Sequence, residues 1–283
     1  MKIVVDSGST KADWILIKTE EDCELTTTLG LNPEVLGHDD LIKRILQSSQ
    51  IDAIKSQVAE LYFYGSGCGT PRSVQYMESA LKEVFSNATT IEVKEDTYAA
   101  VYATTQGNPA IVCINGTGSN CSYFDGKKLN QKVDSLGYMA MDDCSGSDFG
   151  KQLIRAYYFN QMPDDLRTVF ENQYDLRADS LKNNFYKKEN PNAFLAGFLP
   201  FLIANQSHAF IKNMVDKTVD FFVENYIMQY KNSQEVPIHF VGSVAYLLQD
   251  FFRTALDKKG LKAGKFVQKP IDGLKEYYLW QKK

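Results

Sequence analysis

The chain has 283 residues, of which 44% are hydrophobic and 23% are charged, a globular composition in a length that suits one large domain or two of ordinary size. A net charge of −4 and the lack of a basic stripe argue against a nucleic-acid partner. No apolar run approaches the roughly 18 residues of a membrane helix and no signal peptide is recognised, so we expect a cytoplasmic protein with no membrane partner.

The cysteines and histidines argue against several kinds of chemistry. The five cysteines are odd in number and form no C-x-x-C pair, so we expect reduced thiols rather than a disulfide framework or a zinc site. None of the three histidines lies near a nucleophile signature, so serine-hydrolase chemistry has no support.

The first stretch of the chain predicts a β-hairpin with a polar tip. An apolar run leads into Asp6–Lys11, which contains Gly8, Ser9 and Thr10, and Ala12–Lys18 then reads as a second strand. Small residues leave backbone N–H groups open to an anion, and the hydroxyls, the lysine and the aspartate suit a phosphate with a hard metal ion beside it. A polar turn without a ligand explains the stretch equally well. It is not a P-loop, because a strand follows and the Gly-x4-Gly-Lys pattern is absent.

The rest of the first hundred residues alternates strands and helices. In chain order we expect a strand at 23–29, a turn at 30–33, a helix capped by 38–40, a strand at 59–64, a glycine loop at 65–69, a helix from Pro71 to Phe85, a strand at 89–94 and a helix from Asp96. Ligands gather at the carboxyl ends of strands in such sheets, where Asp6, the glycine loop and Asp96 fall. Asp96 can also be simply the N-cap of its own helix.

A second strand–hairpin–strand–hairpin–strand pattern begins about 110 residues after the first, which predicts an internal architectural repeat. Its strands are expected at 110–114, 121–124 and 128–133, with a small-residue turn at 115–120. Helices are expected over most of 146–160 and 163–230, then a strand at 236–241, a turn at 242–245, a helix at 246–256, a strand at 265–268 and a closing helix at 270–280.

Five motifs in this order resemble the actin/hexokinase/Hsp70 superfamily, and within it the N-acetylglucosamine kinase group of the BadF/BadG/BcrA/BcrD ATPase family. Asp6–Lys11 resembles the first phosphate motif, Gly116–Ser119 the second, and Gly242–Ala245 the adenosine motif. Gly30–Pro33 resembles the sugar-contacting loop, and Asp96 falls where the catalytic aspartate is expected. The resemblance spans nearly the whole chain.

The resemblance implies an α/β fold of two related ribonuclease H-like (actin-like ATPase) domains with a nucleotide cleft between them. The expected domains are 1–107 and 108–269, and a C-terminal helix over residues 270–283 can pack back on the first. Homodimers are common in families that look like this.

The resemblance also implies ATP-dependent phosphorylation of an amino sugar, first of all N-acetylglucosamine or glucosamine, with Asp96 as the general base. Asp6 would hold Mg²⁺ through water. The expected nucleotide-binding residues are Asp6, Gly8, Ser9, Thr10, Lys11, Gly116, Thr117, Gly118, Ser119, Gly242 and Ser243. The expected sugar-binding residues are Asn32, Ser66 and the adjacent Asp142 and Asp143, here called the acid pair. Asn32 also suits an ordinary turn, Ser66 a bare strand-to-helix turn, and the acid pair a solvated loop.

One stretch departs from the kinase pattern and leaves other functions open. Met141 and Cys144 stand where the kinases carry glycines, and Asp143 stands where they carry a glutamate, so the substrate can differ or the site can be weakened. One alternative is an ATPase that activates a reductase or dehydratase through a shared iron–sulfur cluster, for which Cys121 and Cys144 lack an evident ligand arrangement. The other is a sugar or nucleotide sensor without catalysis.

Overall fold

A computed structural model describes residues 1–8, 11–19, 21–188 and 190–280 of the chain. The chain divides into two compact units. Unit 1 comprises Met1–Gly107 together with the chain from Lys269 onward, and unit 2 comprises Asn108–Gln268. None of the described helices combines the length and the apolar character that a bilayer-spanning segment requires.

Unit 1 is built on a mixed five-stranded sheet with the strand order β3-β2-β1-β4-β5. Strands β1, β2 and β3 form an antiparallel meander, whereas β4 and β5 run parallel to β1. The strands are β1 (Lys2–Ser7), β2 (Lys11–Ile17), β3 (Cys23–Leu29), β4 (Glu60–Gly65) and β5 (Thr90–Glu95).

Helices cover both faces of this sheet because successive strand side chains point to opposite sides. In β1, Ile3 and Val5 join the core beneath α1 and α3, while Val4 joins the core beneath α4 and α13. The helices of unit 1 are α1 (His38–Leu46), α2 (Ser49–Ile54), a 3₁₀ turn (Lys55–Gln57), α3 (Pro71–Val84), α4 (Asp96–Thr105) and α13 (Pro270–Trp280).

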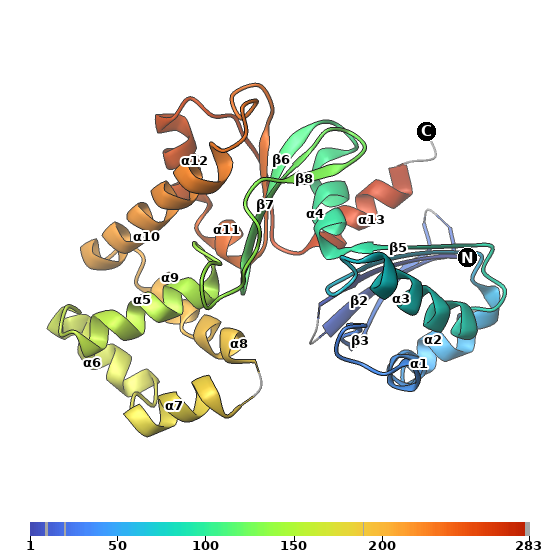
Figure 1. Ribbon diagram of the computed structural model, residues 1–283, viewed down its shortest axis with the longest axis horizontal. Coiled ribbons are helices and arrows are strands. Elements are labelled where there is room, and N and C mark those ends of the chain that lie inside the picture. Colours follow the sequence, from blue (N-terminus) through green and yellow to red (C-terminus); the bar gives the residue numbers. More distant parts are fainter. Residues whose placement is uncertain (9–10, 20, 189, 281–283) are drawn as a thin grey trace. The chain divides into compact units, whose positions relative to one another are not determined.

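Helix α13 returns from the end of the chain to lie alongside α4 (Figure 1). The Tyr278 hydroxyl hydrogen-bonds the Tyr64 hydroxyl of β4, and the Tyr277 ring stacks on Tyr102 of α4 with centroids 4.9 Å apart. Gly273 permits the close approach, since a Cβ there would lie 2.4 Å from the carbonyl oxygen of Ala103. The last helix is therefore part of the core of unit 1.

Unit 2 repeats the strand order of unit 1, as β8-β7-β6-β9-β10. The first strand, β6, is again central, with its hairpin partner on one side and parallel strands on the other. The strands are β6 (Ala110–Asn115), β7 (Ser119–Phe124), β8 (Leu129–Gln131), β9 (Ile238–Val241) and β10 (Ala263–Val267). The predicted internal repeat and the two-part α/β fold are confirmed.

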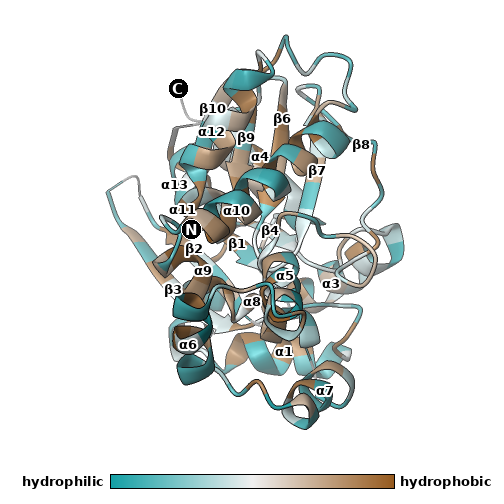
Figure 2. Cartoon of the chain, turned by 90° about the vertical axis from the view of Figure 1, so that its left-hand side faces the viewer, coloured by the Kyte–Doolittle hydropathy of each residue, from teal (hydrophilic) through white to brown (hydrophobic). Residues whose placement is uncertain are grey.

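The helices of unit 2 pack their apolar faces into one large core with the sheet. Strand β6 is hydrophobic along most of its length, while α10 and α12 carry hydrophilic outer faces (Figure 2). These helices are α5 (Gly146–Tyr158), α6 (Asp164–Gln173), α7 (Ala178–Tyr186), α8 (Pro191–Ala196), α9 (Leu199–Ala204), α10 (Ala209–Phe222), a π-helical turn (Val223–Ile227), α11 (Ser243–Leu247) and α12 (Gln249–Lys258).

The structure corrects several local predictions. The helix expected at 246–256 is two helices that meet at the buried Leu248, and α2, which begins at a Ser48 cap, was not predicted. The cap of α1 is Gly37 rather than the His38–Asp40 segment. Asp96 is the first helical residue of α4, whose N-cap is Glu95, so the prediction of Asp96 as an N-cap is wrong.

Candidate active site

The carboxyl ends of β1, β4 and β5 bring three predicted features to one edge of the unit 1 sheet. In the register, Asp6 lies opposite Tyr64, and Gly65 lies opposite Glu95. Asp6, the glycine loop 65–69 and Asp96 therefore meet where ligands of parallel sheets usually bind.

The two carboxyls at this edge are electrostatically unusual. Burial raises the pKa of Asp6 to about 7, with further contributions from the charges of Asp96 and Asp13. Burial also raises the pKa of Asp96 to about 6, assisted by the charge of Glu95 and opposed by hydrogen bonds from the backbone N–H groups of Thr97 and of Asp96 itself. A carboxyl with a pKa near 6 is still largely ionised at neutral pH and is a stronger base than an ordinary aspartate.

The first hairpin is closed by its own backbone. The Gly8 N–H donates to the carbonyl oxygen of Lys11 at 3.0 Å, so the expectation that this N–H is open to a phosphate is wrong. The Lys11 ammonium is about half exposed and lies 2.6 Å from the carboxylate of Asp13. Ser9 and Thr10, also expected to bind phosphate, lie outside the described residues.

Ser7 connects this hairpin to the two loops that are predicted to contact the sugar, at residues 30–33 and 65–69. Its hydroxyl accepts the N–H of Leu31 at 2.9 Å, and its carbonyl oxygen accepts the N–H of Ser66 at 2.8 Å. The Asn32 side chain then lies against Gly67, where a Cβ would be 2.2 Å from the Asn32 Oδ1 atom. Three segments far apart in sequence thus share one edge.

Asn32 has the turn role that its sequence also allowed. Its Oδ1 atom accepts the backbone N–H of Glu34 at 2.9 Å, and its carbonyl oxygen accepts the N–H groups of Val35 and Leu36. Its sugar contact therefore stays a prediction, as does that of Ser66.

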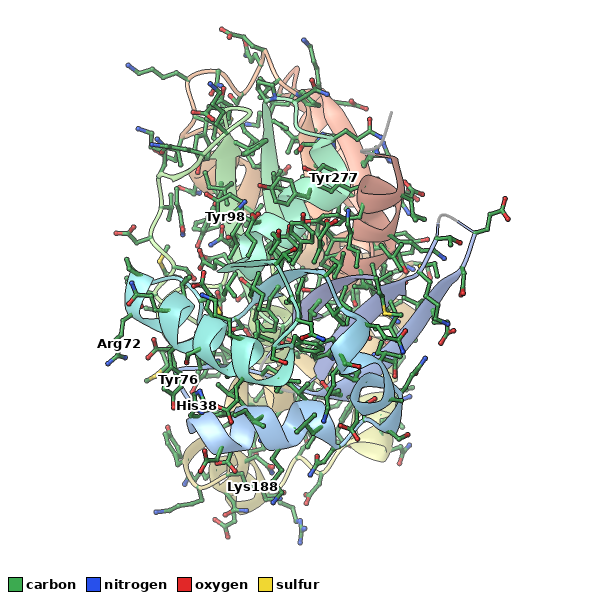
Figure 3. The ribbon with its side chains drawn as sticks, turned by 90° about the vertical axis from the view of Figure 1, so that its right-hand side faces the viewer. His38, Arg72, Tyr76, Tyr98, Lys188 and Tyr277 are labelled. Atoms are coloured by element: carbon green, nitrogen blue, oxygen red, sulfur yellow. The ribbon has the colours of Figure 1, made fainter. Side chains whose placement is uncertain are left out.

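A pocket of about 200 Å³ lies beside the Asn32 turn and was not predicted. Its lining comes from the turn and from the first two turns of α3, namely Pro33, Glu34, Arg72, Ser73 and Tyr76. Arg72 and Tyr76 point outward from α3 (Figure 3). The centroid of the Tyr76 ring lies 5.8 Å from that of the His38 ring of α1, and the Arg72 guanidinium is 3.1 Å from the Glu34 carboxylate. Local periodicity carried no signal for this meeting of turn and helix.

The second hairpin, in unit 2, turns its carbonyl oxygens toward the start of α5. The carbonyl oxygens of Gly116 and Thr117 accept the N–H groups of Gly146 and Ser147 at 2.8 and 3.1 Å, and the Gly116 N–H donates to the carbonyl oxygen of Gly118 at 3.0 Å. The N–H groups of Thr117 and Gly118 have no acceptor within the described part of the chain. Such successive N–H groups in a small-residue turn form an anion-binding concavity.

The acid pair is bound to this hairpin and to the π-helical turn. The Oδ1 atom of Asp142 accepts the Ser119 N–H at 3.1 Å, so the prediction that this N–H is open to a phosphate is wrong. The Asp143 carbonyl oxygen accepts the Ser119 hydroxyl at 2.7 Å, and its carboxylate accepts the Tyr226 hydroxyl at 2.6 Å. The acid pair is therefore not the solvated loop that the sequence allowed, and its sugar contact remains a prediction.

The predicted adenosine motif packs against the same hairpin. Gly242 has a φ of +116°, and a Cβ there would lie 2.4 Å from the carbonyl oxygen of Asn115, so only glycine fits. Its N–H donates to the carbonyl oxygen of Val267, and α11 begins at the next residue, Ser243. The structure thus brings Gly116–Ser119 and Gly242–Ser243 together at one end of the unit 2 sheet.

Asp6 and Asp96 suit a hard metal ion better than Cys121 and Cys144 suit an iron–sulfur cluster. Asp6 and Asp96 offer hard oxygen atoms that repel one another, an arrangement that a divalent cation would relieve, and Mg²⁺ needs only one or two carboxylates besides phosphate and water. Cys121 and Cys144 are buried in the unit 2 core. Within the described residues, no three His, Cys, Asp or Glu side chains are grouped so as to hold a metal ion.

Known proteins resemble this chain in structure. A crystal structure from Porphyromonas gingivalis described as a "putative N-acetylglucosamine kinase" is 32% identical, covers 100% of both chains and has a TM-score of 0.91. A protein from Chromobacterium violaceum with the same description is 15% identical over 98% of each chain, with a TM-score of 0.74. A ROK family glucokinase from Streptomyces griseus, in complex with glucose and AMPPNP, is 12% identical over 98% of this chain and 97% of its own, with a TM-score of 0.56. No family model and no curated protein matches the chain.

Proposed function

The chain belongs to the family of sugar kinases with the actin-like ATPase fold that includes the Porphyromonas gingivalis protein, and we propose that it phosphorylates an amino sugar with ATP. N-acetylglucosamine is the leading substrate, because the related protein is described as a "putative N-acetylglucosamine kinase", and glucosamine is the second candidate. Within the family we place it in the N-acetylglucosamine kinase group of the BadF/BadG/BcrA/BcrD ATPases. We further propose a cytoplasmic enzyme, with a homodimer as its assembly.

The observation that carries this proposal is the half-buried Asp96 at the carboxyl end of β5. Its carboxylate, with a pKa of about 6, would accept the proton of the attacking sugar hydroxyl, a role typically worth roughly 10²–10⁴ in rate. Phosphoryl transfer otherwise needs positioning and charge neutralisation rather than covalent help from the protein.

The remaining residues would bind and orient the two substrates. In unit 2, the Thr117 and Gly118 N–H groups would hold phosphate oxygens, and Gly242 and Ser243 would let the adenine ring lie on the backbone. In unit 1, Lys11 would add a positive charge, and Asp6 would hold Mg²⁺ through water; the ion would supply charge neutralisation at the phosphates.

The sugar would lie on the side of Asn32 and Ser66. The pocket lined by Pro33, Glu34, Arg72, Ser73 and Tyr76 adjoins the Asn32 turn and offers room for a sugar substituent. This placement rests on the contact of Asn32 with Gly67 in the loop that contains Ser66.

The test is a coupled assay of ADP release with Mg-ATP and a panel of glucosamine, N-acetylglucosamine, N-acetylmuramic acid and glucose. We expect ADP to form only when an amino sugar is present, and a sugar phosphate to be detected by mass spectrometry. Failure of every panel sugar to stimulate turnover would overturn the proposal. Tight sugar binding without a phosphorylated product would instead favour a sensor.

A further inference from the structure

The Asp142 side chain lies on the hairpin that the proposed function assigns to phosphate. Its Oδ1 atom accepts the Ser119 N–H at 3.1 Å, and a Cβ at Gly118 would lie 2.8 Å from its Oδ2 atom. The carboxylate therefore covers the Gly118–Ser119 peptide, next to the open N–H groups of Thr117 and Gly118. An anion from the chain itself already uses part of this concavity.

The loop around Asp142 is held in this position by several anchors. Asp142 and Cys144 both have left-handed backbones, with φ of +63° and +58°, which costs free energy for residues other than glycine. The Asn115 side-chain amide donates to the Cys144 carbonyl oxygen at 3.1 Å, and the Ser119 hydroxyl donates to that of Asp143. Strain of this kind persists only where surrounding contacts enforce it.

The carboxylate also gives up solvation in this position. Asp142 is buried, and burial raises its pKa, with the neighbouring charge of Asp143 acting in the same direction and the Ser119 N–H and Lys151 opposing it. A carboxylate that moved out toward water would regain this solvation. The hydrogen bond from the Ser119 N–H therefore favours this position of the carboxylate, whereas the loss of solvation disfavours it.

We propose that the Asp142 carboxylate is an internal occupant of the anion site at Gly116–Ser119, which a nucleotide phosphate must displace from the Ser119 N–H. One N–H group cannot serve a carboxylate and a phosphate oxygen at once, and two negative charges a few ångströms apart repel one another. The inference rests on the proposed function, because it takes the second hairpin as a phosphate site.

The test is the affinity of the whole chain for ADP, measured by isothermal titration calorimetry in EDTA and again with Mg²⁺. Asp142→Asn removes the charge at nearly constant size, and Asp142→Gly removes the occupant and suits the left-handed backbone. We expect both variants to bind ADP about tenfold more tightly than the wild type in EDTA, a difference of about 1.4 kcal/mol. Thermal unfolding checks that each variant is folded.

Asp143→Asn is the matched control, because it removes a charge from the adjacent residue, whose carboxylate is bound to Tyr226 rather than to the hairpin. We expect it to change the affinity for ADP less than twofold. Unchanged or weaker binding by both Asp142 variants, or an equal gain in the control, would overturn the inference while leaving the proposed function standing. If neither the wild type nor the variants bind ADP even with Mg²⁺, the proposed function fails and the inference with it.

Discussion

Asp96 is held at the start of α4 by hydrogen bonds from its own and the following backbone N–H group, and its pKa is raised by burial. We expect Asp96→Asn to lower kcat by roughly 10²–10⁴ because the amide cannot accept the hydroxyl proton. The affinity for ADP should be unchanged, since the variant keeps the size of the side chain. Steady-state kinetics with the best panel sugar and calorimetry with ADP measure the two quantities.

Glu95→Gln is the control for this prediction. Glu95 is exposed and adjacent in sequence, and its carboxylate accepts the Thr97 hydroxyl at 3.3 Å. We expect kcat to change by less than about tenfold, because this group contributes to the pKa of Asp96 without being the base. Turnover by Asp96→Asn close to that of the wild type would remove Asp96 from the proposed role.

The raised pKa of Asp6, at the same edge of the sheet, makes the stability of the protein depend on pH. Its pKa is about 7 in the folded chain against an unperturbed 3.8, so between these values the folded state binds a proton that the unfolded state has lost. The contribution of this group to the free energy of unfolding therefore falls as the pH rises from about 4 to about 7, and stays low above that range.

We expect Asp6→Asn to raise the free energy of unfolding by roughly 2–4 kcal/mol at pH 8, since one pKa unit corresponds to about 1.4 kcal/mol, and to have little effect at pH 4. Urea unfolding of the metal-free protein at both pH values measures this. Asp13→Asn is the control: it removes the smallest of the named causes of the Asp6 shift together with the ion pair to Lys11, so any gain should be far smaller than that of Asp6→Asn. An equal effect of Asp6→Asn at the two pH values would contradict the assigned cause.

At the scale of elements, Gly242, at the junction of β9 and α11, packs closely against the backbone of the second hairpin. We expect Gly242→Ala to destabilise the protein by roughly 2–4 kcal/mol, because the new Cβ meets the backbone of Asn115 and φ is +116°. Binding of ADP should weaken in parallel, since the hairpin must shift. Denaturant unfolding and calorimetry measure both effects.

Gly260→Ala separates the effect of backbone strain from that of contact with the hairpin. Gly260 also has a positive φ, of +67°, but a Cβ there would meet nothing within 4 Å. We expect a loss of only about 1 kcal/mol and unchanged ADP binding. Equal losses in the two variants would mean that backbone strain, and not contact with the hairpin, fixes glycine at 242.

The elements that could be predicted from the sequence are those with a strong local pattern. Strand β3 and helix α13 have the predicted bounds, and both β-hairpins were recognised from their small-residue turns. The break at Leu248 was missed because α11 and α12 both present apolar residues to one core, so the helical periodicity runs on across the junction.

The placement of candidate site residues was predictable only at the end of a strand, where Asp6 is the last but one residue of β1 and Asp96 directly follows β5. The contact of Asn32 with Gly67, and that of Asp142 with Gly118–Ser119, depend on segments far apart in sequence. Local periodicity holds no information about which loops meet, so the contact of Asp142 with the second hairpin was not predicted, and its sugar contact stays a prediction.

At the scale of the whole molecule, elements that follow one another along the chain do not always share a hydrophobic core. The last helix, α13, follows β10 of unit 2 in sequence but packs in unit 1, where Ile271, Leu274 and Tyr278 join Val4 and Ile15 of the first hairpin. The stability of the first strands therefore depends on residues near the end of the chain.

We expect Leu274→Ala to destabilise unit 1 by roughly 2–5 kcal/mol, because the side chain is fully buried between α4 and the sheet and its loss leaves a cavity. Hydrogen exchange followed by mass spectrometry should quicken in β1, β2, β4 and α4, and should be unchanged in β6 and β9. Leu256→Ala, a fully buried leucine of α12 in the unit 2 core, is the matched control and should show the reverse pattern. Faster exchange in β9 and β10 after Leu274→Ala would mean that α13 supports the unit that precedes it in sequence rather than the one in which it packs.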